Sequence, residues 1–318
     1  MKGSSGRRWL RWLERGIALL VLGFLIAYLV ENWNQVREYE WRIDWGRMSL
    51  AVLLHAAVYT GYVVLWRHVL LALGARLSLV DAHRIWYLAN LGRYVPGKVL
   101  QLAGIAYLAR SKGVSPVVGV ASTIVSQMFV LATGFAVAVV ALPEAAERVA
   151  WLEPVALVSA AILFVVLLTP AFDRLYHRAL RLGGRAEHHV EVAWTTRLAL
   201  TVGYTALWIA FGTAFWLFVG AVADLAAGAY WPVVGTWVIG YLAGWIVVFV
   251  PGGLGVREGV YAGLLALYIP LTIAVATSVL ARVWSTAVEL AIAGGLLARY
   301  GLADLRAGAP PEPRDAHG

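Results

Sequence analysis

The stretch Phe249-Val250-Pro251-Gly252-Gly253 interrupts a long apolar segment, and Tyr94-Val95-Pro96-Gly97-Lys98 does the same in the first half of the chain. Proline lacks a backbone donor and glycine adds backbone freedom, so a helix is expected to break at both places. In lipid, the freed backbone groups are costly unless protein or a water-filled cavity surrounds them. Paired breaks at matching positions in two halves of a chain are typical of a transport site.

The composition outside these breaks indicates a membrane protein. Of the 318 residues, 61% are hydrophobic and only 14% are charged, whereas a soluble domain carries about 25% charged residues. Several apolar stretches reach the roughly 20 residues that cross a bilayer, and none alternates as a barrel strand would. We therefore expect an all-α polytopic membrane protein. The chain has no cysteine, which excludes disulfides and thiolate metal sites.

The distribution of lysine and arginine predicts the orientation in the membrane. The N-terminus and the stretches 67–84 and 174–197 are basic, whereas 31–47 and 143–153 are mixed or acidic. Basic loops stay in the cytoplasm, so we expect a multi-pass cell inner membrane protein with cytoplasmic N- and C-termini. The same rule explains the net charge of +8 without nucleic acid as a partner.

Loop charge and hydropathy together predict where the chain crosses the membrane and where it turns back. Two segments, 81–111 and 231–268, contain the Pro-Gly breaks and are predicted to be re-entrant helical hairpins. The alternative for 231–268 is two ordinary spanning helices joined at Pro251, and the accessibility of Gly253 would distinguish the two. About six spanning helices are expected besides these hairpins, at 15–30, 48–73, 115–142, 153–169, 195–219 and 271–299.

Each half of the chain then has the order helix, helix, broken hairpin, helix. Because the two halves begin on opposite sides of the membrane, this order predicts an inverted-topology repeat. Residues 1–150 form the first repeat and residues 151–300 the second. We expect 301–318, which is rich in proline, glycine and charge, to be a disordered cytoplasmic tail.

Charged side chains near the breaks suggest an anion site. A charge at the bilayer centre costs about 2.5–3.5 kcal/mol, so such residues pair, face a wet cavity or snorkel to the surface. Helices that restart after each break would add free N–H groups and a partial positive charge. The predicted binding residues are Arg93, Pro96, Gly97, Lys98, Gln101, Pro251, Gly252, Gly253, Gly255, Arg257 and Glu258.

Arg282 and Glu289 lie seven residues apart and therefore share one helix face. They are predicted to serve coupling or ion pairing, with Arg282 either bridging to Glu258 or touching a ligand. Gln127 is instead expected to form a hydrogen bond between two helices. No catalytic motif, metal-ligand cluster or cofactor motif is recognisable in the sequence, so we expect neither an enzyme nor a cofactor-binding protein.

The motifs at 92–98 and 251–258 resemble those of the flippase-like family, also described as the lysylphosphatidylglycerol synthase transmembrane region. The resemblance implies a polytopic inner-membrane protein. In the multiple peptide resistance factor proteins, a similar region is associated with moving aminoacylated phospholipid between leaflets and is fused to a soluble transfer domain. No such domain follows the last apolar segment here, so synthase activity is not expected. Other relatives are linked to glycosyl or isoprenoid-lipid pathways.

These observations favour a lipid flippase. We expect a lipid with an anionic headgroup, of phospholipid or polyprenyl-phosphate type, to cross through a groove at the two breaks. One alternative is a small-solute transporter that is proton-coupled through Glu258 or Glu289. The other is a non-transporting scaffold that holds a glycosyl- or aminoacyl-transferase at the membrane.

Overall fold

The computed structural model describes residues 23, 25, 27–94, 99–141, 152–174, 178, 192–247 and 253–301. Within these ranges all regular structure is helical and there is no strand, which confirms the predicted all-α class. Most of the predicted helix at 15–30 and of the tail at 301–318 lies outside the described residues.

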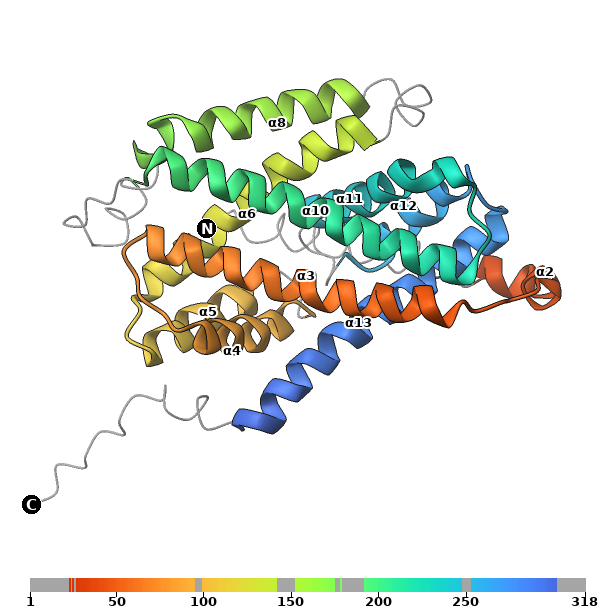
Figure 1. The fold of residues 1–318 in the computed structure, drawn as a ribbon, viewed down its shortest axis with the longest axis horizontal. Coiled ribbons are helices and arrows are strands. Elements are labelled where there is room, and N and C mark those ends of the chain that lie inside the picture. The colour runs from red at the N-terminus through yellow and green to blue at the C-terminus, as the bar shows by residue number, and fades with distance from the viewer. Residues whose placement is uncertain are drawn as a thin grey trace, which may run out of the picture.

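The helices follow the chain in the order that hydropathy predicts (Figure 1). They are α2 (Trp33–Glu38), α3 (Trp45–Ala72), α4 (Leu79–Asn90), η1 (Leu91–Tyr94), α5 (Val99–Ser111), α6 (Pro116–Ala141), α8 (Leu152–Leu168), α10 (Trp194–Val222), η2 (Ala227–Ala229), α11 (Tyr230–Ile246), α12 (Val256–Leu265) and α13 (Leu271–Tyr300).

Four of the described helices, α3, α6, α10 and α13, are long and apolar enough to cross a membrane. Their starts have local causes. Asp44 caps α3 by accepting a hydrogen bond from the Arg47 backbone N–H at 3.0 Å. Proline stands at the first position of α6, where its missing N–H removes no helical bond. These spans confirm the polytopic membrane class.

Helices α3 and α10 pack side by side along their length and run antiparallel (Figure 1). At one end the Asp44 backbone N–H donates to the Ala221 carbonyl at 2.9 Å. Further along, the rings of Tyr62 and Tyr204 lie 5.7 Å apart. Residue numbers rise along one helix as they fall along the other, which shows that the two helices are antiparallel. Because α3 belongs to the first half of the chain and α10 to the second, we call this helix pair the central seam.

Glycines set the close approach at this seam. A Cβ on Gly61 would lie 3.0 Å from Leu207 Cδ2, and a Cβ on Gly203 would lie 2.8 Å from Leu65 Cδ2. Each helix therefore offers a glycine to a leucine of the other. Small residues of this kind allow two membrane helices to approach closely.

The first Pro-Gly break lies between two short helices that pack together, α4 and α5. They have 12 and 13 residues, or about 18 and 20 Å, which is less than the roughly 30 Å of a bilayer core. A Cβ on Gly104 would lie 3.2 Å from Ala89. Lys112 Nζ lies 3.2 Å from Asp81 Oδ1, which brings the two ends of the hairpin together.

The second break lies between α11 and α12, which also pack together. The rings of Trp237 and Tyr261 are stacked, with centroids 5.7 Å apart. Gly240 makes room for this contact, because a Cβ there would overlap the Tyr261 ring. Helix α12 has 10 residues, about 15 Å, which is too short to cross a bilayer alone. This length argues against two ordinary spanning helices in the segment 231–268.

The two hairpins pack against opposite ends of the central seam (Figure 1). Trp86 of the first contacts Trp66, in the C-terminal half of α3, with ring centroids 5.1 Å apart. Trp237 of the second contacts Phe215, in the C-terminal half of α10, at 5.2 Å. Because α3 and α10 are antiparallel, these two C-terminal halves point in opposite directions.

Contacts between helices repeat from one half to the other. Helix α6 packs on α5 and α3, as α13 packs on α12 and α10. Across the halves, α6 also contacts α11 and α13 contacts α4. Each hairpin is thus flanked by a long helix from each half of the chain.

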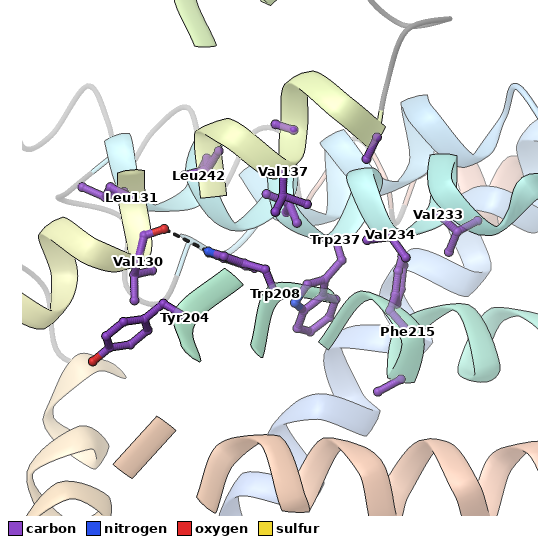
Figure 2. Close-up of a cluster of buried hydrophobic side chains, with 14 of the residues drawn as sticks. Val130, Leu131, Val137, Tyr204, Trp208, Phe215, Val233, Val234, Trp237 and Leu242 are labelled. Carbon is purple, nitrogen blue, oxygen red and sulfur yellow. Dashed lines mark hydrogen bonds between the residues drawn. The ribbon is translucent and has the colours of Figure 1, made fainter. Parts of the chain in front are cut away.

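The main apolar core lies among α6, α10 and α11 and is rich in aromatic rings (Figure 2). Trp208 Nε1 donates to the Val130 carbonyl at 2.9 Å, which ties α10 to α6. A backbone carbonyl is the acceptor that a buried indole N–H needs. The core therefore positions the helices that surround the second hairpin.

A substitution in the first hairpin tests its packing. Gly92 lies in η1, and a Cβ there would be 2.8 Å from backbone atoms of Leu100 and Gln101. We expect Gly92→Ala to destabilise the protein by about 1–3 kcal/mol, because backbone cannot move aside easily. Thermal unfolding in detergent measures the effect. The control is Gly263→Ala in α12, where a Cβ meets nothing within 4 Å. An unchanged melting temperature for Gly92→Ala would contradict the close packing.

Cysteine labelling tests the predicted inverted topology, and the absence of native cysteine makes single-cysteine variants clean. Gly253 itself is unsuitable because it is buried and has φ +70°. Exposed positions at the hairpin ends serve instead. We expect Arg76→Cys and Arg110→Cys to react with an impermeant maleimide from one side, and Asp224→Cys and Pro270→Cys from the other. Labelling of the last two from different sides would show that the second segment crosses the membrane.

Candidate functional site

A cavity of about 310 Å³ lies where the two halves of the chain meet. It is bounded by α3, α4, α5, α6, α10, α11, α12 and α13, so both hairpins contribute to its wall. The wall is amphipathic, with aromatic and aliphatic side chains between a few polar groups. The polar and charged lining residues, tyrosines aside, are Asn90, Gln101, Thr123, Gln127, Arg257, Arg282, Ser285 and Thr286.

Arg257 brings a cation from the second hairpin to this cavity. Its guanidinium carbon lies 4.7 Å from the centre of the Tyr241 ring. The side chain fits only because Gly244 has no Cβ, which would lie 2.7 Å from Arg257 Cγ. The buried Nε of Arg257 has no hydrogen-bond partner among the described residues. The site therefore holds an oriented cation with a free donor.

Glu258, the neighbour of Arg257, points elsewhere and meets α13. Its Oε1 lies 3.5 Å from Arg282 Nε, and the residue is 1% exposed. Adjacent helical residues point about 100° apart, so Arg257 can face the cavity while Glu258 turns to another helix. The distance between Arg282 and Glu258 matches the bridge that the sequence suggested, and Arg282 also lines the cavity.

The turn before α12 depends on glycine. Gly253 has φ +70° and Gly255 has φ +80°, a region that other residues rarely adopt. Gly253 lines the cavity and Gly255 is the N-cap of α12, with no side-chain cap. The first N–H groups of a helix have no partner within it. The two glycines thus shape the turn that leads into α12 and Arg257.

A chain of hydrogen bonds joins the first hairpin to α13. Gln101 Nε2 donates to Asn90 Oδ1 at 2.9 Å, and Asn90 Nδ2 donates to Glu289 Oε1 at 2.7 Å. Glu289 is 1% exposed and lies behind Asn90, whereas Asn90 and Gln101 reach the cavity. A buried carboxylate is stabilised by such a donor. The first hairpin therefore contributes neutral amides to the wall.

Gln127 of α6 also lines the cavity, next to the ring that holds Arg257. The Tyr241 hydroxyl donates to Gln127 Oε1 at 3.5 Å, which is the interhelical contact predicted for Gln127. The buried Nε2 of Gln127 has no hydrogen-bond partner among the described residues. Tyr241 therefore links two side chains of the cavity wall, each of which has a buried nitrogen without a described partner.

The charge on the cavity wall is positive. Among the described lining residues, the charged ones are Arg257 and Arg282. The two buried glutamates nearby, Glu258 and Glu289, do not line the cavity. Charges in a low-dielectric site interact much more strongly than in water. Because Arg282 is paired with Glu258, Arg257 carries the charge that suits this wall to an anion.

Several predicted site residues are not placed by the structure. Pro96, Gly97, Lys98, Pro251 and Gly252, together with the side chain of Arg93, lie outside the described residues. Of the rest, Gln101, Gly253, Arg257 and Arg282 meet at one cavity, with Glu258 and Glu289 behind its wall.

The prediction missed Asn90 and the aromatic wall. Asn90 could have been found from the sequence, because it is a polar residue between Ala89 and Leu91 in an apolar segment. The aromatic side chains of the wall come from several helices, some near helix ends and some from helix interiors. No local sequence pattern therefore indicated that they meet at one cavity. The aromatic lining residues are Tyr59, Tyr62, Trp86, Tyr204, Trp208, Phe211, Trp237, Tyr241 and Trp245. Within the described residues, no group of three or more histidine, cysteine or acidic side chains could hold a metal ion.

Comparison with known proteins places this architecture in a family. No curated protein matches the chain. The family model described as the lysylphosphatidylglycerol synthase TM region matches residues 15–293, from the first apolar stretch to the C-terminal half of α13. That range holds both breaks and every described cavity residue. The family description links such membrane regions to lipid handling. The chain therefore belongs to the lysylphosphatidylglycerol synthase transmembrane-region family.

Proposed function

We propose that this protein moves a lipid with an anionic headgroup between the two leaflets of the inner membrane. The observation that carries the proposal is the cavity between the two hairpins, whose charged described lining residues are Arg257 and Arg282. The family supports a membrane protein linked to lipid handling. An arginine fork is well suited to the oxygens of a phosphate. The headgroup would enter the cavity while the tails stay in the bilayer.

The cavity wall is also suited to an amphipathic cargo. Aliphatic side chains such as Leu102, Ile124 and Met128 line one part, and amides and arginines line another. Ile124 is 51% exposed and lies one turn of α6 from Gln127 and Met128. Ligand pockets generally combine an apolar wall with a few placed polar groups. A purely hydrophilic solute would leave the aliphatic part of this wall unmatched.

An inverted repeat would give this cavity access to both leaflets. Its support is the antiparallel seam of α3 and α10, the hairpins at opposite ends of it, and the matching contacts of α6 and α13. In this proposal residues 1–150 and 151–300 rock against each other around the headgroup. Transporters built from inverted repeats bind their substrates at the repeat interface. The distribution of basic residues supports a cytoplasmic position for both termini in this proposal.

Removal of the cavity cation tests the site. We expect Arg257→Gln to slow movement of a short-chain fluorescent anionic phospholipid in proteoliposomes by about tenfold or more, because a charged hydrogen bond contributes about 1.5–3 kcal/mol. A leaflet-specific quenching assay gives the rate. Arg299→Gln is the matched control, since Arg299 also lies over a tyrosine ring, that of Tyr300, but outside the cavity. Equal rates for Arg257→Gln and wild type would count against the site.

Lys98 extends this test to the first break. The residue lies outside the described part of the chain, and its role as a second cation rests on its position after Pro96-Gly97. In the same assay, Lys98→Ala combined with Arg257→Ala is expected to be slower than either single variant. A double variant no slower than Arg257→Ala would remove Lys98 from the site.

A proton-coupled solute transporter is the second candidate, and the position of Glu289 favours it. This buried carboxylate is one hydrogen bond from the cavity, because it accepts from Asn90, which lines the cavity and accepts in turn from Gln101. Chains of acidic side chains and their partners serve as proton relays in transporters. Under this function Glu289 would exchange a proton as the solute crosses.

Glu289→Gln separates the two functions. Glutamine can still accept the hydrogen bond from Asn90, so a lipid flippase is expected to keep its rate within about threefold. A proton-coupled transporter would instead lose the pH dependence of its uptake. Lipid movement and uptake are measured in the same proteoliposomes at several pH values. Loss of pH-dependent uptake with no lipid movement in either protein would replace the first function with the second.

A further inference from the structure

Glu258 is a buried charge that has no part in the proposed site. It is 1% exposed, and neither of its carboxylate oxygens accepts a hydrogen bond from the described residues. Its ion-pair partner among them is Arg282 of α13, whose Nε lies 3.5 Å from Glu258 Oε1. A carboxylate removed from water needs such compensation. Arg282 is therefore the group on which the charge of Glu258 depends.

Arg282 also belongs to the cavity. It lines the cavity, and 17% of its side chain is exposed, against 2% of the side chain of Glu258. The arginine thus reaches the space from which the carboxylate is excluded. A guanidinium carries five N–H groups in a planar fork, so it can meet one anion at each edge. Arg282 can therefore face Glu258 behind the wall and a second anion within the cavity.

The charges of Arg257, Glu258 and Arg282 lie close enough to act on one another. The buried hydroxyl of Tyr261 interacts electrostatically with all three, which places them around one side chain. In a low-dielectric site, charges attract and repel much more strongly than in water. An anion bound at the two arginines would be repelled by Glu258 and would compete with it for Arg282. Glu258 therefore acts against a bound anion although it does not line the cavity.

This competition affects how readily a cargo can leave. A transport site must bind its cargo well enough to admit it and loosely enough to release it. With Glu258 ionised, its charge offsets that of Arg282, so one arginine remains uncompensated at the wall. Without Glu258, two arginines would hold the phosphate with charge-assisted hydrogen bonds. Tighter binding of this kind acts mostly by slowing dissociation.

We infer that Glu258 is an internal counter-ion of the cavity, which competes with the phosphate of the cargo for Arg282 and thereby promotes its release. This inference rests on the proposed lipid movement and concerns one step of it. Arg257 attracts the phosphate, and Arg282 is shared between the phosphate and Glu258. Glu258 is thus a positioning residue that acts on the cargo through Arg282, not a residue that binds the cargo.

Replacement of Glu258 by glutamine tests this role. Glu258→Gln keeps the size of the side chain and removes its charge. We expect the variant to bind a short-chain fluorescent phosphatidylglycerol about tenfold more tightly than wild type, mainly through slower dissociation. Fluorescence polarisation of the full chain in detergent measures the dissociation constant and the dissociation rate. In proteoliposomes, Glu258→Gln is expected to move the same lipid about tenfold more slowly at saturation, whereas loss of a merely structural ion pair would weaken binding as well.

Two comparisons isolate the effect of the charge. Glu289→Gln is the matched control, since Glu289 is equally buried but accepts a hydrogen bond from the neutral amide of Asn90. Its affinity for the probe is expected to stay within about twofold of wild type. Diacylglycerol with the same dye and tails lacks the phosphate, so it is expected to bind wild type and Glu258→Gln equally.

Two further variants test whether the effect passes through Arg282. When Glu258→Gln is combined with Arg282→Gln, the gain in affinity is expected to disappear, because the arginine that Glu258 had occupied is gone. If Glu258→Gln does not fold, Glu258→Asp takes its place. Its shorter side chain keeps the charge but reaches Arg282 less well, so a gain of about threefold in affinity is expected.

The outcomes separate the counter-ion from the proposed function. Equal or weaker binding by folded Glu258→Gln, or tighter binding without slower movement, would overturn the counter-ion and leave lipid movement intact. A gain of the same size in Glu289→Gln, for diacylglycerol or in the double variant would overturn it too. Wild-type protein that is folded but neither binds nor moves the phospholipid would overturn the proposed function, and the counter-ion with it.

Discussion

A backbone interrupted inside hydrocarbon must be enclosed by other parts of the protein. This constraint explains why α4, α5 and α12, each too short to span the bilayer, pack inward against longer helices. The helices that flank them come from both halves: α6 contacts α11 across the halves and α13 contacts α4. Neither half supplies its own complete enclosure, so the cavity exists only when the two halves are assembled.

The helices could be predicted from sequence because they depend on local composition. The expected spans 48–73, 115–142 and 271–299 correspond to α3, α6 and α13 within a few residues at each end. The two helix breaks could be predicted for the same reason, since proline and glycine interrupt a helix locally, and the described helices end and restart on either side of both. That the two segments are re-entrant stays a prediction. The different directions of Arg257 and Glu258 followed from helix geometry alone.

The residues that form the cavity could be predicted only in part, because they depend on which helix faces pack against each other. Asn90 and Gln101 are eleven residues apart and touch only because the first hairpin folds back on itself. Gln127 was correctly read as an interhelical contact, but its free donor becomes visible only when Tyr241 is placed on the other side. Helix α13 reaches both hairpins through side chains about 10 Å apart along its axis, Arg282 to Glu258 and Glu289 to Asn90.

The two glycine–leucine contacts of the α3–α10 seam limit how the halves can move. In the structure Gly61 faces Leu207 and Leu65 faces Gly203. A slide of one helical turn in one direction would bring Leu65 against Leu207, and a slide in the other would leave a void between two glycines. Packed interfaces resist both overlap and voids. The seam therefore resists sliding of α3 along α10, so any movement of one half against the other would have to be a tilt about this contact.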